Sequence, residues 1–579
     1  MNGNFPASSL WYRLAFATLS TSLGAWFGAC AANTGDAPGP GEAPDEPAAA
    51  PVAAPGEASF GPGGGFGGGF GGGFGGGPGA PPGGDLVRVV PLSQEPLPAP
   101  TGLHIVDQAA AVRLGKALFW DVQVGSDGQT ACASCHFQAG ADDRTRNALH
   151  PGPDGAFASG GVTGPGQVFT PSNIANDDRV GSQGVARATF VSVNPDPNEA
   201  ADQCVAAPAP PFAAERQVTG RNSPTVIGAV FFRDAFWDGR ANHVFNGNDP
   251  FGLTANGAGP EAIENAALAS QAVGPPNDGV EMACAGRAFN GPGGLGTKLL
   301  ARVALRLQRV APDDGVLGPL ADPAGAGLRC DGAPCTYREL VRRAFGDALA
   351  AAAEADFSLL WGEALYAYQA TLVPDQAPVD RFLAGDFAAL TPSQQQGFGV
   401  FMGAGRCNAC HNGGLLSDAT WRAFQIAGPR NADGGDQGFH NLGVRPTGED
   451  LGRAALGPGG ASFSVSGAAA DRGAFKTPGL RNVKLTAPYF HNGGKATLGD
   501  VVDFYARGGD VQNPERSSLL RPFAVTAAQR AALVDFLAGA LTDCRVEKER
   551  APFDHPALPL PNRASGLDAV GATGTGACP

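Results

Sequence analysis

Two short segments of this chain carry the same arrangement of cysteine and histidine. They read Cys132-Ala-Ser-Cys135-His136 and Cys407-Asn-Ala-Cys410-His411. This C-x-x-C-H pattern is typical of c-type haem attachment, in which two thiols bond to the porphyrin vinyl groups and the histidine supplies an axial iron ligand. A zinc site or two structural disulfides would not need a histidine directly after each cysteine pair. The motifs therefore predict two covalently bound haems.

The second axial position of each predicted haem decides between electron transfer and reaction with small molecules. Methionine is a usual ligand in electron-transfer cytochromes, yet only Met282 and Met402 lie beyond the first residue of the chain. Neither follows a C-x-x-C-H motif at a suitable distance. We therefore expect at least one haem to use histidine, tyrosine or no protein ligand. The histidines outside the motifs are His104, His150, His243, His440, His491 and His555.

Helices are expected to position both motifs. Thr391-Pro-Ser-Gln394 and Thr526-Ala-Ala-Gln529 are capping boxes, in which a threonine and a glutamine satisfy the first N–H groups of a helix. The first predicts a helix over 391–402 that leads to Cys407. The second predicts a closing helix with apolar residues at helical spacing up to Leu541. Residues 107–119, before the first motif, have a helical pattern as well.

The pattern is also helical over 337–372, where Trp361, Tyr366 and Tyr368 are expected in the core rather than against a cofactor. Glycine (87) and proline (49) are frequent and favour loops. A helix, a haem motif, loops and a closing helix are the layout of a small cytochrome c domain. We therefore predict a mainly α fold with two cytochrome c-like haem domains, long loops and few strands.

The N-terminal residues indicate export. Arg13 precedes an apolar stretch over 14–27, and Phe-Gly-Ala-Cys30 follows, which predicts an export signal with a cleavage site. A cysteine directly after Gly-Ala resembles a lipoprotein site, so Cys30 is a candidate for lipidation, and ordinary cleavage that leaves Cys30 free is the alternative. Residues 36–84 are rich in Pro, Ala and Gly and repeat GGGF, so we expect a flexible tether without a core.

Export to an oxidising compartment permits disulfides. Outside Cys30 and the two motifs six cysteines remain, and this even number suggests three bridges. Nearness in sequence favours Cys330–Cys335 and Cys544–Cys578, which leaves Cys204–Cys284.

The charge and hydropathy of the chain exclude other classes of protein. The formal net charge is −14 and no basic patch stands out, so we exclude nucleic-acid binding. Beyond the N-terminus no apolar run reaches the roughly 18 residues of a spanning helix. Membrane contact would therefore come only through a lipid on Cys30.

Several further segments accompany the motifs in a fixed order. Together with the motifs they resemble the bacterial di-haem cytochrome c peroxidases and the related MauG-type enzymes, over most of the folded chain. The segments are RLGKALF at 113–119, GRNSPTV at 220–226, FWDGR at 236–240, SQAVGP at 270–275, EM at 281–282, FKTPGLRN at 475–482, TAPYFH at 486–491 and VVDFY at 501–505.

The resemblance implies a division of labour between the two haems. The haem on His136 would react with peroxide at an open distal face, and the haem on His411 would accept and store electrons. Trp237 would relay electrons between them. Glu281 would be the distal acid or base, with Gln271 beside it. This role agrees with the chemistry, because peroxide cleavage needs a proton moved from the inner to the outer oxygen.

The resemblance also implies a calcium ion near the domain interface. Asn222 and the backbone carbonyls of Thr486 and Pro488 would hold it, and water would complete the shell. Neutral oxygen ligands of this kind suit a hard cation. The alternative is that Asn222 only caps a turn before Pro224.

One departure from the peroxidase pattern concerns access to the first haem. Many di-haem peroxidases carry a histidine just before the R-N-x-P segment, and it blocks the first haem until the second is reduced. Here no histidine lies between His150 and His243. We therefore expect a permanently open first haem, with His150 as the remaining candidate for a blocking ligand.

A second departure concerns the ligand opposite His411. Tyr505 stands where the peroxidases usually place methionine and where the MauG-type enzymes place tyrosine. A phenolate stabilises oxidised iron more than a thioether does. We therefore expect Tyr505 as the second ligand of this haem. The alternative is that Tyr505 packs in the core and His440 or His491 is the ligand.

The expected organisation has five parts. They are an export signal over 1–29, a Gly/Pro/Ala-rich tether over 30–84, an N-terminal peroxidatic haem domain with insertions over 85–388, a C-terminal electron-transfer haem domain over 389–545 and a C-terminal tail over 546–579.

The leading hypothesis for function is a c-type di-haem peroxidase. It would reduce hydrogen peroxide to water with electrons from a small cytochrome c or cupredoxin, in the periplasm or anchored to a membrane on its periplasmic or outer side. The first alternative is a MauG-type oxidase, in which a high-valent di-haem state oxidises a protein or organic substrate. The second is a non-enzymatic electron-transfer cytochrome with both haems six-coordinate. The resemblance allows a homodimer, although no surface in the sequence marks one.

Overall fold

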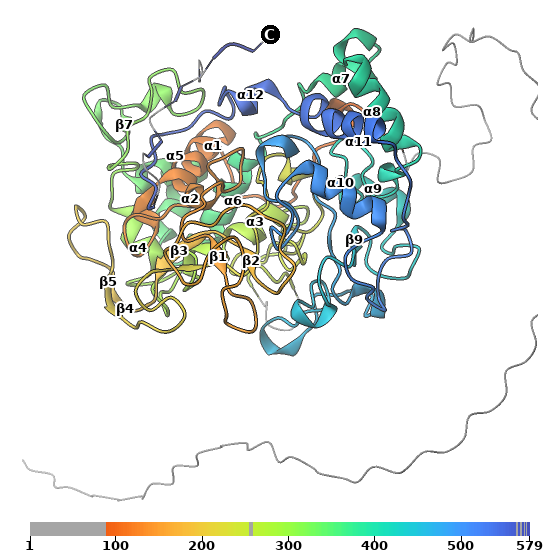
Figure 1. Cartoon of the computed structure of the whole chain (residues 1–579). Coiled ribbons are helices and arrows are strands. Elements are labelled where there is room, and N and C mark those ends of the chain that lie inside the picture. The colour runs from red at the N-terminus through yellow and green to blue at the C-terminus, as the bar shows by residue number, and fades with distance from the viewer. Residues whose placement is uncertain are drawn as a thin grey trace, which may run out of the picture. The chain divides into compact units, whose positions relative to one another are not determined.

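Helices joined by long loops build the described part of the chain (Figure 1). The computed structural model describes residues 88–253, 259–562 and positions 566, 567, 570, 571, 574 and 576–578. The predicted export signal, Cys30 and the tether lie outside the described residues. Within the described part, no helix is both long and apolar enough to cross a membrane.

The helices precede and follow each haem motif, as the capping boxes predict. In chain order they are α1 Gln108–Trp120, α2 Ala133–His136, α3 Ala267–Ala272, α4 Leu295–Leu300, α5 Tyr337–Ala352, α6 Phe357–Gln369, α7 Pro378–Leu383, α8 Pro392–Met402, α9 Trp421–Ala427, α10 Leu498–Arg507, α11 Ala527–Asp535 and α12 Cys544–Glu547.

The strands are short and pair only two at a time, always antiparallel. The pairs are β1 Leu149–His150 with β2 Arg179–Val180, β3 Gln183–Ala186 with β6 Arg216–Val218, β4 Ala188–Ser192 with β5 Gln203–Ala206, β7 Arg329–Cys330 with β8 Ala333–Pro334, and β9 Phe439–His440 with β10 Phe475–Lys476. The mostly helical fold with few strands is therefore as predicted.

Two clusters of buried apolar residues form the cores. The larger one gathers α1, α3, α4, α5 and α6, and α1 packs against both α5 and α6 (Figure 1). The smaller one gathers α7, α8, α10 and α11. The first haem motif adjoins the larger core, and Cys407 of the second motif packs against the smaller one.

Glycine permits the closest helix contacts in each core. A Cβ on Gly115 of α1 would collide with the Ala364 carbonyl of α6. Likewise, a Cβ on Gly397 of α8 would collide with the Ala532 carbonyl of α11. The helices that flank the motifs are thus fixed backbone against backbone.

The predicted helix starts are confirmed. Thr391 and Thr526 each form the expected capping box at the start of α8 and α11. The stretch over 337–372 differs from the prediction because it is two helices, α5 and α6, separated by a turn at 353–356. Its aromatic residues Trp361, Tyr366 and Tyr368 are buried, as expected.

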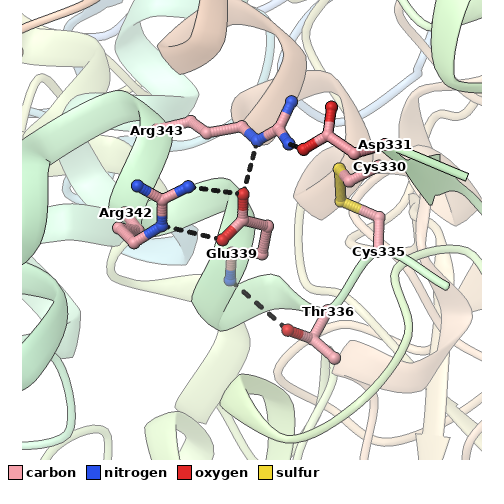
Figure 2. Close-up of a disulfide and its surroundings, with 7 residues drawn as sticks. All are labelled: Cys330, Asp331, Cys335, Thr336, Glu339, Arg342 and Arg343. Atoms are coloured by element: carbon pink, nitrogen blue, oxygen red, sulfur yellow. Dashed lines mark hydrogen bonds and ion pairs between the residues drawn. A yellow bond between two sulfur atoms is a disulfide. The ribbon is translucent and has the colours of Figure 1, made fainter. Parts of the chain in front are cut away.

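All three predicted disulfides are confirmed, namely Cys204–Cys284, Cys330–Cys335 and Cys544–Cys578. Among the described residues, the free cysteines are the four of the haem motifs. Figure 2 shows that the Cys330–Cys335 bridge lies directly before α5, whose first turn is capped by Thr336. In this turn Glu339 forms ion pairs with Arg342 and Arg343. The bridge therefore fixes the entry into a core helix.

Helix α12 and the segment that follows it pack against the first core, although they come last in the chain. Val546, Phe553 and Leu558 belong to the larger apolar cluster. Asp554 reaches Lys116 of α1 at 2.9 Å in a fully buried ion pair. This part of the C-terminal segment is thus built into the domain that carries the first motif.

Candidate functional site

The first C-x-x-C-H motif forms the short helix α2 and presents its histidine in a fixed orientation. The Nδ1 atom of His136 lies 2.8 Å from the Gly140 carbonyl oxygen. Because a carbonyl can only accept, Nδ1 carries the proton and Nε2 keeps a free lone pair. The thiols of Cys132 and Cys135 are half-buried and unpaired. These groups match the donor set of a covalent haem with a histidine ligand.

Glu281 lies beside this motif although it is far from it in sequence. Its carboxylate charge acts on the sulfur atoms of Cys132 and Cys135. Burial, together with the nearby Asp278 carboxylate, raises the pKa of Glu281 to about 7, and Arg240 opposes this rise. Asp278 also accepts the Glu281 backbone N–H at 3.0 Å, which fixes the turn. A carboxyl group of this kind can take up and release a proton near neutral pH.

Gln271 is less clearly connected to the first site. It is half-buried at the end of α3, and the Gly274 backbone N–H donates to its carbonyl at 3.1 Å. No hydrogen bond joins its side chain to Glu281 in the described part of the chain. Phe236 lies close to Gly274, and Arg240 stacks over the Phe236 ring at 3.9 Å. The end of α3 and the residues 236–240 thus border the same region as Glu281.

The second motif opens onto a cavity of about 220 Å³. His411 is buried there, and its Nδ1 atom lies 3.0 Å from the Leu416 carbonyl oxygen, so its Nε2 atom is again free. Cys407 and Cys410 also line the cavity. The second site therefore has the same set of donor atoms as the first site. Here a cavity lies directly beside the histidine.

Tyr505 lines this cavity from α10, whose start is fixed by a capping box between Thr497 and Asp500. Within the described residues, its phenol oxygen makes no hydrogen bond. Burial raises the pKa of Tyr505, and the charges of Cys410 and Cys407, which line the same cavity, add to the rise. Met402 is not among the lining residues.

The two alternative histidines also line the cavity, but in other roles. His440 is engaged on both ring nitrogens, with Asp418 at 2.8 Å and Ser517 at 3.4 Å. His491 stacks face to face on Phe475 with ring centroids 3.5 Å apart. Burial lowers the pKa of His491 to about 3, and Arg221 and Arg179 add to the fall.

Trp237 connects the second cavity with the segment that approaches Glu281. It lines the cavity, and its indole N–H donates to the Asn222 carbonyl at 2.8 Å. The Trp237 carbonyl in turn accepts the Lys476 backbone N–H at 2.8 Å. Arg240, three residues later, is the cation that acts on Glu281. The short segment 237–240 therefore reaches both sites.

Lys476 provides a further test of whether a haem fits the second cavity. Its side chain is buried and lines the cavity, and its ammonium lies 3.1 Å from the centre of the Phe232 ring. Within the described residues it has no hydrogen bond or ion pair from that ammonium. Burial lowers the pKa of Lys476 to about 7, and the Asp234 carboxylate opposes this without an ion pair. The propionates of a haem would add negative charge that favours the ammonium form. The residues present therefore fit the group.

Asn222 does not cap a local turn. Its amide nitrogen lies 2.7 Å from the Pro488 carbonyl oxygen and 3.3 Å from that of Phe490. Thr486 lines the same cavity. If the amide turned over, its oxygen would face two carbonyl oxygens, an arrangement that a cation between them would stabilise. Such neutral oxygens fit calcium, with water completing the coordination.

His150 is held away from the role of a blocking ligand. Its Nδ1 atom accepts the Gly152 backbone N–H at 3.1 Å, and its ring packs against Phe212. Phe212 in turn contacts Phe157, which packs against the small apolar cluster around β1 and β2. Within the described residues, no contact joins His150 to Glu281 or to His136.

Comparison with known proteins agrees with this arrangement. Residues 109–388 match the model of the di-haem cytochrome c peroxidases. Over these residues the chain is similar to the di-haem cytochrome c peroxidase family. The members of that family carry two c-type haems, in agreement with the two C-x-x-C-H motifs of this chain.

Among curated relatives, cytochrome-c peroxidase IdrP2 of Denitromonas iodatirespirans is 37% identical over 29% of this chain and 45% of its own length. The methylamine utilization protein MauG of Methylorubrum extorquens is 36% identical over 30% of this chain and 42% of its own. Cytochrome c551 peroxidase of Pseudomonas aeruginosa is 30% identical over 49% of this chain and 56% of its own length. The chain thus spans about half the length of these relatives.

Two solved structures are similar at low identity. A MauG-like protein associated with microbial copper homeostasis is 20% identical, with a TM-score of 0.42 over 80% of this chain and 96% of that one. The di-haem peroxidase BthA of Burkholderia thailandensis is 20% identical, with a TM-score of 0.41 over 78% and 90%.

Some residues of the site could not be found from the sequence. Arg240 and Asp278 set the charge around Glu281, and Lys476 brings a buried cation to the second cavity. Arg240 and Lys476 lie inside segments that carry the family resemblance, which was the only available signal. For Asp418, the buried partner of His440, the sequence holds no signal.

Proposed function

We propose that this protein is a c-type di-haem peroxidase that reduces hydrogen peroxide to water with electrons from a small redox protein. The observation that carries the proposal is Glu281, a half-buried carboxyl group with a pKa near neutrality beside the thiols of the first motif. A peroxide-reducing site needs such a proton carrier, and a simple electron-transfer cytochrome does not.

The ligand assignments follow from the free ring nitrogens. Cys132, Cys135 and His136 would hold one haem, and Cys407, Cys410 and His411 the other. Attached haems supply the iron at which the peroxide oxygen–oxygen bond breaks and the store for the electrons. Tyr505 would complete the second site, because its phenol faces the cavity without another partner.

Glu281 would move the proton that peroxide cleavage requires. In its ionised form the carboxylate takes the proton of the inner peroxide oxygen and then delivers it to the outer oxygen, which leaves as water. Two further protons and two electrons complete the reduction to a second water. Gln271, at the end of α3, would orient the peroxide through its amide.

Electrons would reach the first site through the segment 237–240, which reaches both sites. They would enter at the second site from a small cytochrome c or cupredoxin and pass by Trp237. The indole is held between the Asn222 carbonyl and β10, so its position is fixed relative to both sites.

The test is consumption of hydrogen peroxide by the purified di-haem protein, with a reduced small cytochrome c or cupredoxin as donor. We expect two donor molecules oxidised for each peroxide. The Glu281→Gln variant should retain both haems and lose most of this turnover. A wild-type protein with two haems and no donor-dependent consumption would contradict the proposal, and failure of cyanide to bind either ferric haem would favour a simple electron-transfer cytochrome.

A MauG-type oxidase is the second candidate, favoured by Tyr505 and by the position of His150 away from the first site. Such an enzyme would use the oxidising power of peroxide on a protein or organic substrate. Mixing the fully ferric protein with peroxide distinguishes the two. A prompt change of the haem spectrum without prior reduction favours the oxidase, and a change only after one haem is reduced favours a gated peroxidase.

We further propose a calcium ion held by Asn222 and the carbonyls of Thr486 and Pro488. The position of Asn222 beside the Pro488 carbonyl supports it, since the amide oxygen and the carbonyl oxygens offer neutral ligands of the kind that calcium takes. Removal of calcium by a chelator should change the haem spectrum and slow turnover, and added calcium should restore both. If the metal content of the purified protein shows no calcium and chelators have no effect, the site does not exist.

The remaining proposals concern location and organisation. We propose an exported, periplasmic enzyme that a lipid on Cys30 and the tether over 30–84 hold near a membrane. The haem domains would extend over 85–388 and 389–545, and the two apolar cores support this division. Mass spectrometry of the mature N-terminus tests the lipid, and sedimentation tests whether the enzyme is a homodimer.

A further inference from the structure

Four aromatic side chains form a continuous cluster on the α1 side of His136. Phe119 and Trp120 end α1, Tyr368 comes from α6, and His555 comes from the C-terminal segment. We call these four residues the proximal aromatic cluster. The proposed reaction uses none of them.

The cluster is in ring-to-ring contact from its first member to its last. The Phe119 ring lies 6.4 Å from that of His136, 5.5 Å from Tyr368 and 5.9 Å from Trp120, centroid to centroid. His555 stacks on the indole of Trp120 at 4.6 Å and 13°. Trp120 is therefore two short ring-to-ring steps from the proposed iron ligand, a separation over which electrons transfer readily.

Trp120 is the member of the cluster that can lose an electron most easily without losing a proton. Its indole N–H donates to the Tyr368 hydroxyl oxygen at 3.0 Å, and the two side chains are 4% and 2% exposed. The phenol of Tyr368, by contrast, has no acceptor for its own proton in the described part of the chain. Oxidation of Tyr368 would require that proton to leave, whereas the indole can hold a positive charge as it stands.

The surroundings of Trp120 carry an excess of negative charge. Lys116, one turn earlier in α1, forms ion pairs of 2.9 Å with both Asp314 and Asp554, and all three side chains are fully buried. With both carboxyl groups ionised, one ammonium and two carboxylates have a formal charge of −1, although burial raises the pKa of Asp554. Burial raises the pKa of Tyr368, and the two carboxylates add to the rise, which places their field on the Trp120–Tyr368 pair. In a buried site such a field stabilises a nearby positive charge.

We propose that Trp120 is a one-electron oxidation site that serves the first haem. When peroxide has oxidised that haem and no reduced donor is present, the indole gives it one electron. The haem is reduced by one electron and Trp120 becomes a cation radical that keeps its Nε1 proton in the hydrogen bond to Tyr368. An electron from the donor later restores the indole. The proposal rests on the proposed peroxide reaction. It adds a side chain that can be oxidised by one electron and that is distinct from the proposed relay Trp237.

The experiment mixes the fully ferric holoprotein with one equivalent of hydrogen peroxide, freezes it rapidly and records electron paramagnetic resonance. Protein with ring-deuterated tryptophan identifies an indole radical by its narrowed hyperfine pattern. We expect this radical in the wild type and its loss in Trp120→Phe. Trp361→Phe is the matched control, because Trp361 is equally buried in the same core and donates to a carbonyl at 2.9 Å. It should leave the signal unchanged.

Two further variants and a chemical readout guard against misfolding of Trp120→Phe. Tyr368→Phe removes the oxygen that accepts the indole N–H, and Asp554→Asn removes one negative charge. Both should lower the radical yield. Repeated peroxide additions without donor should leave oxygenated Trp120 in peptide mass spectra and should spare Trp361.

The outcomes separate this inference from the proposed function. If the haem spectrum responds to peroxide but the radical persists in Trp120→Phe, or disappears only in Trp237→Phe, the inference is wrong and the peroxidase proposal stands. A haem spectrum that peroxide leaves unchanged overturns both.

Discussion

The ionisation of Glu281 should make the rate of peroxide reduction depend on pH. The negative charge of Asp278 and the positive charge of Arg240 should shift the midpoint of this dependence in opposite directions. The carboxylate must be ionised to take the peroxide proton, so kcat/KM should rise with pH and level off above a midpoint near 7, the pKa that burial and Asp278 give this group. Asp278→Asn keeps the hydrogen-bond acceptor for the turn but removes the negative charge, so the midpoint should fall. Arg240→Gln removes the opposing cation, so the midpoint should rise.

The magnitude follows from the role of the group. Glu281→Gln cannot carry a proton, and loss of general acid–base catalysis typically costs about 10²–10⁴-fold in rate, or about 3–5 kcal/mol of activation free energy. The residual rate should no longer depend on pH near neutrality. The assay is donor-dependent peroxide consumption between about pH 5 and pH 9, with haem content matched between variants.

The raised pKa of Glu281 also predicts how the free energy of unfolding depends on pH. For most carboxylates ionisation in the folded protein is favourable, whereas here it is unfavourable. The folded protein holds the Glu281 proton more tightly than the unfolded chain, so the free energy of unfolding falls as pH rises from about 4.5 to 7. Relative to the wild type, Glu281→Gln should gain about 2–3 kcal/mol between about pH 5 and pH 8. Glu281 is not the proton carrier if Glu281→Gln keeps the wild-type pH profile of the rate. The same holds if the midpoints of Asp278→Asn and Arg240→Gln do not move in opposite directions.

Three other predictions follow from the contacts of the fold. Arg481→Met should lower the free energy of unfolding by about 3–5 kcal/mol in denaturant titrations, because it leaves Asp380 buried without its bidentate partner. Removing the Cys204–Cys284 bridge by double substitution to serine should cost about 4 kcal/mol, because the bridge closes a separation of 80 residues. Tyr505→Met should raise the midpoint potential of one haem in a redox titration, since a thioether favours reduced iron more than a phenolate does.

Each of these three predictions has a control or an outcome that would contradict it. The exposed pair Arg381–Asp386 should contribute less than about 1 kcal/mol, and an equal loss there would contradict the role of burial. The Cys330–Cys335 bridge spans only 5 residues and should contribute about 2 kcal/mol, so an equal effect of both bridges would argue against loop closure. Unchanged potentials in Tyr505→Met would mean that Tyr505 is not a ligand.

Features that depend on neighbouring residues in the chain could be predicted from the sequence. The C-x-x-C-H spacing, the capping boxes at Thr391 and Thr526 and the pairing of six cysteines each follow a local or counting rule, and the structure bears out the helices and the bridges. The proximity of Glu281 to the first motif came only from family resemblance, because a single glutamate is by default a solvated residue.

Contacts between distant segments could not be predicted. Lys116 and Asp554 are 438 residues apart, and neither helical periodicity nor composition indicates that they pair. The same holds for Trp120 and His555, which stack although the sequence marks the last segment only as a tail. Such contacts depend on how the C-terminal segment returns to the first core, and one sequence carries no signal for that path.

The most direct test of the central claim is stoichiometric turnover. The purified protein with two haems is mixed with a limiting amount of hydrogen peroxide and an excess of reduced small cytochrome c or cupredoxin, and donor oxidation is followed to completion. We expect two donor molecules oxidised per peroxide in the wild type and a much slower reaction in Glu281→Gln. Donor that stays reduced in the presence of wild-type protein and peroxide would contradict it.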